Sequence, residues 1–280
     1  MLDTARQKQH GATGHELPAA DAATPAGRVE GWRKFLVDLK YLWLEQMLEV
    51  RATWPFFVTF SLLMPLSMVF GFARIGSGLT DRASLLYIVS GAAVFATATE
   101  GLVAMAQRIA WMKREGMMVY YASLPISKVA FVLAIIASRL LVTLPGMLAP
   151  MLVAPLLYRD LALRFSPWVL LLLPLTALSL SSVGMALGSL IDNFELVNAL
   201  TQVLLFLMLL AAPIFIPVES LPLPLRVLGY LLPPSYAADA LRHALGGTVG
   251  RAFFVDVAML LLLTGASLVV LSRWLRWRLK

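Results

Sequence analysis

The sequence predicts an all-α integral membrane protein with six transmembrane helices, and three observations lead to this fold class. Of its 280 residues, 60% are hydrophobic and only 14% are charged, whereas soluble domains average about 45–50% apolar and about 25% charged residues. Long uncharged stretches recur, and most basic residues lie on one side of them if they cross a membrane. We also expect an N-terminal interfacial helix, a cytoplasmic helix after the second span, and a re-entrant outer helical hairpin.

The N-terminal segment, residues 1–30, is polar and rich in Ala, Thr, Gly and Pro, which predicts a disordered cytoplasmic tail. Residues 31–52 then carry apolar side chains at helical spacing, among them Trp32, Leu39 and Trp43. This stripe predicts an amphipathic helix in the membrane interface. The alternative is a soluble helix that packs on a partner. The interface is favoured because a membrane span follows directly.

The remaining residues, 53–280, make up the predicted six-span transmembrane domain. A helix needs about 20 apolar residues to cross the hydrocarbon of a bilayer. Six stretches of the sequence meet this requirement, at about residues 54–73, 84–106, 129–153, 167–190, 196–217 and 252–272.

Between the fifth and sixth spans, residues 219–247 are apolar but contain Pro222, Pro224, Pro233 and Pro234. Proline removes a backbone donor and disrupts a helix interior, and unpaired backbone groups cannot face lipid. We therefore predict two short helices that dip partway into the bilayer and return. The alternative is a seventh span, which would place the C-terminus on the opposite side of the membrane.

The basic residues predict the orientation. Fifteen of the 23 Lys and Arg residues fall on the side of the N-terminus, seven fall on the other side, and Arg139 lies within a span. Because basic residues are retained in the cytoplasm, we expect both termini to be cytoplasmic. The net charge of +7 is then a topological signal, and no nucleic-acid partner is expected.

Sequence motifs for catalysis are missing. The chain has no G-x-x-x-x-G-K-[ST] phosphate loop, no H-E-x-x-H and no G-x-S-x-G, so ATP binding through a phosphate loop and the commonest hydrolase sites are excluded. Cysteine is absent, and His243 is the only histidine beyond the N-terminal tail. We expect neither enzymatic activity, nor a metal site, nor a cofactor in this chain.

Two charged residues, Glu100 and Arg139, fall inside predicted spans. Charges in a bilayer are costly and usually point into protein or into a water-filled cavity. The first hypothesis is a structural ion pair between adjacent spans. The alternative is a contact with the substrate or with a gate.

Other residues of the predicted spans are candidates for helix packing or for lining a translocation path. Gly184 and Gly188 have the small-x-x-x-small spacing of closely packed membrane helices, so we predict a packing role for them. Side chains of the fifth span are candidates for lining an apolar translocation path: Gln202, Phe206, Met208 and Phe215. Contact with lipid or with another helix is an equally good interpretation, and for Gln202 a packing hydrogen bond is favoured.

Three motifs carry a resemblance to a known family. The first is Glu115–Gly116, followed by an apolar stretch and Leu124-Pro125-Ile126-Ser127; the second is Pro233, Pro234 and Tyr236 with Leu241 and Arg242; the third is Tyr87 with Gly91 in the second span. Their order and spacing, over about residues 32–272, resemble type-2 ABC transporter permeases.

The resemblance implies the transmembrane permease subunit of an ABC exporter for drugs, lipids or polysaccharides, in the bacterial inner (plasma) membrane. It would form a dimer with a second copy of the permease and work with two copies of a separate ATPase, which would bind ATP and Mg. Residues 109–127 would be the coupling helix that docks in a groove of the ATPase, and the interfacial helix, residues 31–52, would also touch the ATPase. The coupling residues would be Lys113, Arg114, Glu115, Gly116, Tyr120, Tyr121, Leu124 and Pro125.

The resemblance also implies that the first, second and fifth spans bound the translocation path. The outer hairpin, with Pro233, Pro234, Tyr236 and Arg242, would close the exit of that path. The alternative to the ABC exporter is an ATP-independent channel or a secondary transporter.

Overall fold

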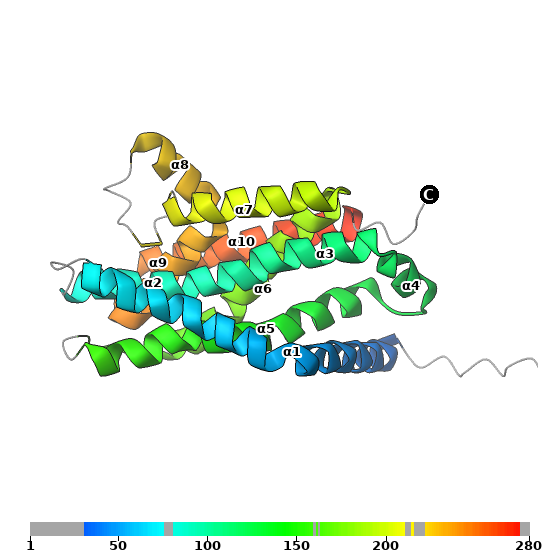
Figure 1. Ribbon diagram of the computed structural model, residues 1–280, viewed down its shortest axis with the longest axis horizontal. Coiled ribbons are helices and arrows are strands. Elements are labelled where there is room, and N and C mark those ends of the chain that lie inside the picture. The colour runs from blue at the N-terminus through cyan, green and yellow to red at the C-terminus, as the bar shows by residue number, and fades with distance from the viewer. Residues whose placement is uncertain are drawn as a thin grey trace, which may run out of the picture.

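The computed structural model describes residues 31–75, 81–158, 161, 163–210, 214–215 and 222–274. Within these ranges every regular element is a helix (Figure 1). The elements are α1 (Gly31–Ile75), α2 (Arg82–Thr97), the π-helix η1 (Ala98–Ala104), α3 (Met105–Arg114), α4 (Met117–Ser123), α5 (Lys128–Leu157), α6 (Pro167–Leu190), α7 (Phe194–Leu210), α8 (Leu223–Leu231), α9 (Pro233–Gly246) and α10 (Arg251–Trp274). The predicted tail, residues 1–30, lies outside the described residues.

Five helical stretches of the described chain are long and apolar enough to cross a membrane, which confirms an all-α membrane protein. They are Trp54–Gly71, Arg82–Arg114, Lys128–Leu157, Pro167–Leu190 and Arg251–Arg273. The predicted fifth span, 196–217, corresponds to α7. Its 17 residues rise about 26 Å, slightly less than the hydrocarbon thickness of about 30 Å; residues 211–213 and 216–217 lie outside the described ranges.

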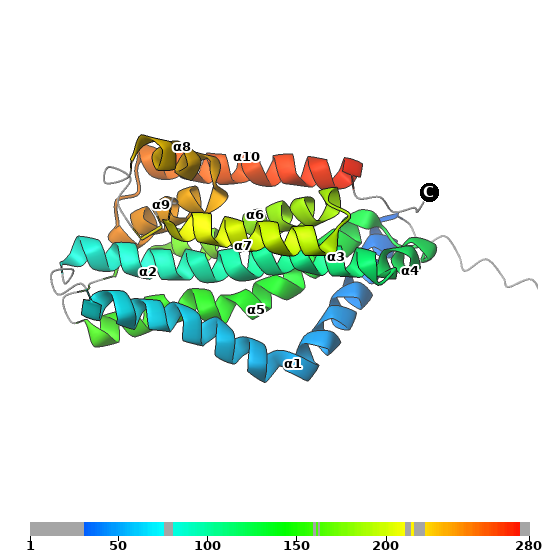
Figure 2. The ribbon, with the colours of Figure 1, turned by 45° about the horizontal axis from the view of Figure 1, so that its top comes forward.

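The long helices lie side by side, and their connections gather at two ends of the bundle (Figures 1 and 2). One end, called the α4 end below, holds α4, the start of α1, the end of α10 and the turn between α6 and α7. The other, the α9 end, holds α8 and α9 with the end of α5. Both ends of the described chain therefore lie at the α4 end.

Helix α1 joins two elements that the sequence predicts separately. It runs from Gly31 to Ile75 without interruption, although the predicted interfacial helix ends at residue 52. Figure 2 shows that α1 is sharply bent, and Pro55 and Pro65 lie inside it. Proline bends a helix because it lacks an N–H group and its ring crowds the preceding turn.

The predicted single helix over residues 109–127 is wrong. Helix α3 continues the second span to Arg114, and α4 begins only at Met117. Between them Gly116 adopts a left-handed conformation with φ of 72°, which glycine tolerates because it has no Cβ. The chain therefore turns sharply here instead of extending one helix.

Helix α6 packs very closely on the second span, as the glycine spacing predicts. A Cβ atom on Gly184 would overlap the carbonyl oxygen of Leu102, and one on Gly188 would overlap that of Ala106. These glycines therefore allow backbone-to-backbone contact between α6 and the η1–α3 segment. The packing role predicted for both is confirmed.

The predicted hairpin, residues 219–247, contains two short helices, α8 and α9; residues 219–221 lie outside the described ranges. Leu232 separates the helices in an extended conformation. Pro233 and Pro234 then occupy the first turn of α9, where a missing N–H leaves no helical hydrogen bond unmade. The prolines thus end one helix and start the next.

Candidate functional site

The first candidate site is the segment in which α3 turns through α4 into α5, residues 111–127, called the elbow below. It lies at the α4 end of the bundle (Figure 1). Its outer surface exposes apolar and aromatic side chains: Trp111 is 42%, Val119 is 44% and Tyr120 is 61% exposed. Exposed apolar side chains that gather in one place mark an interaction surface.

Two hydrogen bonds tie the inner side of the elbow to α1. The hydroxyl of Tyr121, a residue that is only 2% exposed, donates to Glu45 Oε1 at 2.7 Å. The backbone N–H of Ser127 donates to Asp38 Oδ2 at 3.3 Å. Burial, with a smaller effect of this bond to Glu45, raises the pKa of Tyr121, so its hydroxyl stays protonated and continues to donate.

A third link to α1 lies one turn before the elbow. The guanidinium of Arg108 forms an ion pair with Glu49 and donates to Gln46 Oε1 at 2.7 Å. The hydrogen bonds from Arg108 lower the pKa of Glu49. The elbow and the first half of α1 therefore form one connected unit.

A fourth link ties the elbow to the turn between α6 and α7. Lys113 Nζ donates to the carbonyl oxygens of Ser189 at 3.0 Å and Ile191 at 2.9 Å, with Gly188 at 3.4 Å. It also pairs with Asp192 at 2.6 Å. The last carbonyls of a helix have no intrahelical donors and carry partial negative charge, so the ammonium group caps α6.

Arg114 extends this contact to the start of α7. Its guanidinium lies 3.7 Å from Glu195 and 5.2 Å from the ring centre of Phe194. The remaining predicted coupling residues also lie in the elbow, with Leu124 packed against the core and Pro125 exposed. The structure thus brings the predicted coupling residues together at one end of the bundle.

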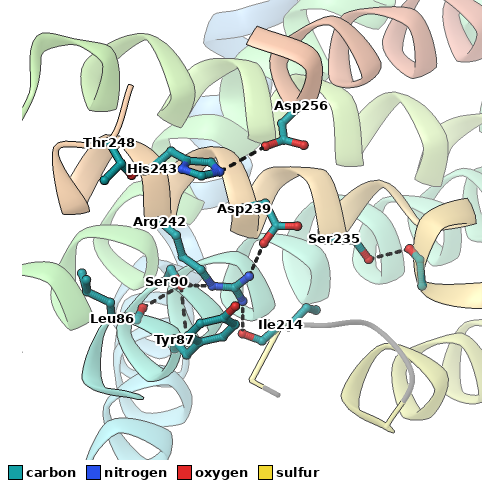
Figure 3. A network of polar contacts seen from close by, with 11 residues as sticks. Leu86, Tyr87, Ser90, Ile214, Ser235, Asp239, Arg242, His243, Thr248 and Asp256 are labelled. Carbon is teal, nitrogen blue, oxygen red and sulfur yellow. Dashed lines mark hydrogen bonds and ion pairs between the residues drawn. The ribbon is translucent and has the colours of Figure 1, made fainter. Parts of the chain in front are cut away.

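The second candidate site surrounds Arg242 at the α9 end (Figure 3). Its guanidinium pairs with Asp239 and donates to Ser90 Oγ at 3.1 Å and to the Ile214 carbonyl at 2.5 Å. It also lies 3.9 Å from the centre of the Tyr87 ring. Because Arg242 is only 9% exposed, these contacts compensate its removal from solvent and tie α9 to α2.

An open pocket of about 480 Å³ lies beside this network, lined by residues of α2, α9 and the segment after α9. His243, on the wall of the pocket, hydrogen-bonds through Nδ1 to Thr248 Oγ1 at 3.0 Å, and its Nε2 lies 4.0 Å from Asp256 Oδ2 of α10.

A separate hydrogen bond joins α9 to α8: the hydroxyl of Tyr236 donates to the Tyr230 carbonyl at 2.6 Å.

A family comparison adds to this geometry. The family model for ABC-2 type transporters matches residues 37–245, from α1 to the end of α9. The chain belongs to the ABC-2 type transporter family. Such membrane domains are non-catalytic permease subunits that generally dimerise and work with a separate ATPase. Among proteins of curated function, none matches the sequence.

The matched range of this ABC-2 permease contains both candidate sites. Two of the three motifs behind the resemblance lie next to each other in the structure. The Tyr87–Gly91 motif of α2 and the hairpin motif that ends at Arg242 are in contact, because the Tyr87 ring stacks on the guanidinium of Arg242. A Cβ on Gly91 would overlap the region of Ile214 and Phe215, so a side chain there would displace the segment after α7.

The two intramembrane charges of the permease lie on adjacent helices. Glu100 lies in the π-helix η1 and Arg139 lies in α5, and these two elements are in contact. Glu100 Oε2 is buried without a hydrogen-bond partner among the described residues. π-helical turns are often found at functional sites, so this carboxylate is a candidate for gating or substrate contact.

The four predicted path residues do not share one surface. Gln202 and Phe206 lie on the exposed side of α7, where Phe206 is 63% exposed. Met208 is completely buried within a core cluster, and the Phe215 ring packs 6.2 Å from that of Phe95. Of these four residues, Gln202 and Phe206 are the two that are exposed in the described structure.

Sequence reasoning missed the contacts that anchor the elbow to α1. Asp38 and Glu45 accept hydrogen bonds from the elbow, and Glu49 accepts one from Arg108 just before it. Their spacing of seven and four residues places them on one side of a helix, which was a signal in the sequence. It also missed Gln107 Nε2, which donates to Thr201 Oγ1 at 3.0 Å and joins α3 to α7. No group of three or more metal-ligating side chains occurs in the described part of the chain.

Proposed function

We propose that this chain is the permease subunit of an ABC exporter, driven by a separate ATPase subunit, that moves an amphipathic or lipid-linked substrate out of the cytoplasm or the inner leaflet. The substrate class includes drugs, lipids and glycans. One observation carries this proposal. The elbow exposes an apolar surface at one end of the bundle and is bonded internally both to α1 and to the α6–α7 turn.

The proposed topology has six spans in the bacterial inner membrane, with α7 as the fifth. Residues 31–52 lie in the membrane interface, residues 1–30 form a cytoplasmic tail, and α8–α9 form a re-entrant hairpin on the outer side. The positive-inside rule supports a cytoplasmic α4 end, since Lys113, Arg114 and Lys128 all lie in or beside the elbow.

The proposed mechanism transmits motion of the ATPase through the elbow. ATP and Mg bind to the two ATPase copies, and the outer surface around Tyr120 docks on one of them. Movement of the elbow pulls on α6 through Lys113 and on α7 through Arg114. Because α7 is the proposed wall of the path, this motion changes the path's access to either side.

In the proposed dimer, the exposed side of α7 faces the second permease copy. Gln202 and Phe206 of the two copies then line the path, and the Glu100–Arg139 pair lies behind it as a structural or gating element. At the far end the hairpin, held by Arg242 and Tyr236, closes the exit.

The experiment compares proteoliposomes that contain the permease alone with proteoliposomes that also contain its ATPase. A fluorescent amphipathic dye and a fluorescent phospholipid serve as transport substrates. We expect ATP- and Mg-dependent movement only when both subunits are present. Movement by the permease alone would instead support an ATP-independent channel or secondary transporter.

Charge-reversed variants then test the elbow. Glu115→Arg is expected to lower both transport and substrate-stimulated ATPase activity, with normal membrane insertion. Arg251→Glu, at an exposed position where α10 begins at the opposite end, serves as the matched control and is expected to retain both activities. Full transport by a variant with the whole elbow replaced by a flexible linker would contradict the coupling role.

A further inference from the structure

Two apolar grooves run along α5 at the α4 end, outside both candidate sites. One lies between α5 and α10 and is lined by Val129, Val132, Leu268 and Leu271, with Lys128 at its edge. The other lies between α1 and α5 and is lined by Leu36, Leu39, Trp43 and Ala137, with Lys40 at its edge. Each groove combines an apolar floor with one ammonium group.

Leu133 of α5 lines both grooves, so the two grooves lie on either side of one residue. Their volumes are about 270 and about 350 Å³. A molecule with two apolar chains joined at a polar head therefore fits the arrangement, with one chain on each side of Leu133.

The charges at the edge of the grooves predict the sign of that head. Lys40 and Lys128 are exposed, and neither forms an ion pair with another residue in the described part of the chain. Arg273 follows the groove-lining Ser272 and is also exposed. The nearby acid, Asp38, accepts the backbone N–H of Ser127 and so caps the start of α5.

We infer that the two grooves bind one anionic phospholipid, whose acyl chains lie on either side of Leu133 and whose phosphate lies between Lys40 and Lys128. Lysines near an anionic bilayer surface each contribute about 1 kcal/mol to lipid binding. The assignment to the cytoplasmic leaflet rests on the proposed function, because that proposal places the α4 end in the cytoplasm. The lipid site itself does not depend on the proposed function.

Charge complementarity favours a lipid over a second copy of this chain. Dimer interfaces with two-fold symmetry join the same surface patch of both subunits. Such an interface centred on these grooves would bring Lys40 and Lys128 close to their own counterparts, and like charges repel. An anionic headgroup instead neutralises them.

The experiment measures lipid binding to the purified full chain by native mass spectrometry, so it requires neither ATPase nor transport. Phosphatidylglycerol and phosphatidylcholine with the same acyl chains are titrated separately. We expect the wild-type protein to prefer phosphatidylglycerol by at least about tenfold. Lys40→Ala and Lys128→Ala should each reduce that preference about fivefold, the equivalent of about 1 kcal/mol.

Two further variants separate the contributions of the grooves and of general charge. Leu133→Trp places a larger side chain between the two grooves and should weaken binding of both lipids while leaving the charge unchanged. Arg226→Ala with Arg251→Ala removes two exposed basic residues elsewhere and should retain the preference. Glycerol phosphate, which lacks acyl chains, should not compete; competition by it would show a free-phosphate site instead.

Three results would overturn the inference. The first is an unchanged preference in the Lys40→Ala/Lys128→Ala double variant, and the second is unchanged lipid binding by Leu133→Trp. The third is conversion of a dimer into a monomer by Leu133→Trp, which would assign the grooves to a second copy. Because none of these readouts involves ATP, failure of the lipid site leaves the proposed exporter function intact.

Discussion

Lys113, in the last turn of α3, donates a hydrogen bond of 2.9 Å to the carbonyl oxygen of Ile191, which directly follows α6. This contact joins two segments that are 78 residues apart in the sequence. Because α7 begins three residues later, at Phe194, we expect a displacement of α3 to move the start of α7.

Replacement of Lys113 by Met tests this connection. Without the ammonium group, its hydrogen bonds to the carbonyl oxygens at the end of α6 are lost. Each such bond from a charged donor contributes about 1.5–3 kcal/mol at most, and the carbonyls are left without this donor. We expect substrate-stimulated ATPase activity of the reconstituted complex to fall severalfold, while membrane insertion stays normal. Arg251→Met, at an exposed position where α10 begins at the other end of the bundle, is the control and should retain full stimulation.

Gly116 provides a test of the sharp turn in the elbow. At φ of 72° an alanine costs about 1–2 kcal/mol, whereas asparagine tolerates this conformation better. Gly116→Ala should therefore lower coupling of ATP hydrolysis to transport, and Gly116→Asn should restore most of it. Gly250→Ala, at an open position with no positive φ, is the matched control; an equal effect of Ala and Asn at position 116 would contradict the conformational explanation.

Arg242 should be essential for the stability of the α9 end. Removal of one partner of a fully buried ion pair costs about 3–5 kcal/mol. Because the Asp239 side chain is 32% exposed, we expect a cost below that range here. We expect Arg242→Met to unfold at a clearly lower temperature than the wild type in a fluorescence-monitored thermal melt. Asp239→Asn in the same chain should recover part of the loss, whereas Arg226→Met on the exposed surface of α8 should have no effect.

The Glu49–Arg108 ion pair predicts a specific dependence on pH. Hydrogen bonds from Arg108 lower the pKa of Glu49, so the ionised carboxylate stabilises the folded state above its ordinary pKa of about 4.3. This stabilisation is lost as the pH falls through the lower pKa of the folded protein. The carboxylate is 53% exposed, so the contribution should be below about 1 kcal/mol.

Thermal unfolding between pH 6 and pH 3 measures this contribution. The wild type should lose more stability over that range than Glu49→Gln, which has no charge to lose. Parallel curves for the two proteins would show that the ion pair does not stabilise the folded state.

Much of the fold was predictable because lipid imposes strong rules on a sequence. Uncharged stretches and their lengths predicted the long helices, and the prolines around Leu232 predicted the separation of α8 from α9. The Gly184–Gly188 spacing predicted close packing of α6, because only small residues allow such an approach.

The candidate sites were predictable only in part, because they depend on contacts between distant segments. The segment around Gly116 was predicted as a candidate coupling site, but its turn was not, since a single glycine does not reveal its φ angle. Met208 was a candidate for lining the path or for contact with another helix, and it is buried in the core. In a membrane helix every face is apolar, so the sequence does not distinguish a path-lining side from a buried one.

The central claim is that the elbow docks on the ATPase, and cross-linking tests it most directly. The chain contains no cysteine, so Tyr120→Cys and Val227→Cys, at positions 61% and 63% exposed, each introduce a single thiol at opposite ends of the bundle. Both are labelled with a benzophenone maleimide in the assembled complex and irradiated. The account predicts a covalent permease–ATPase product from position 120 and none from position 227; equal labelling with no product from position 120, or a product from position 227, would contradict it.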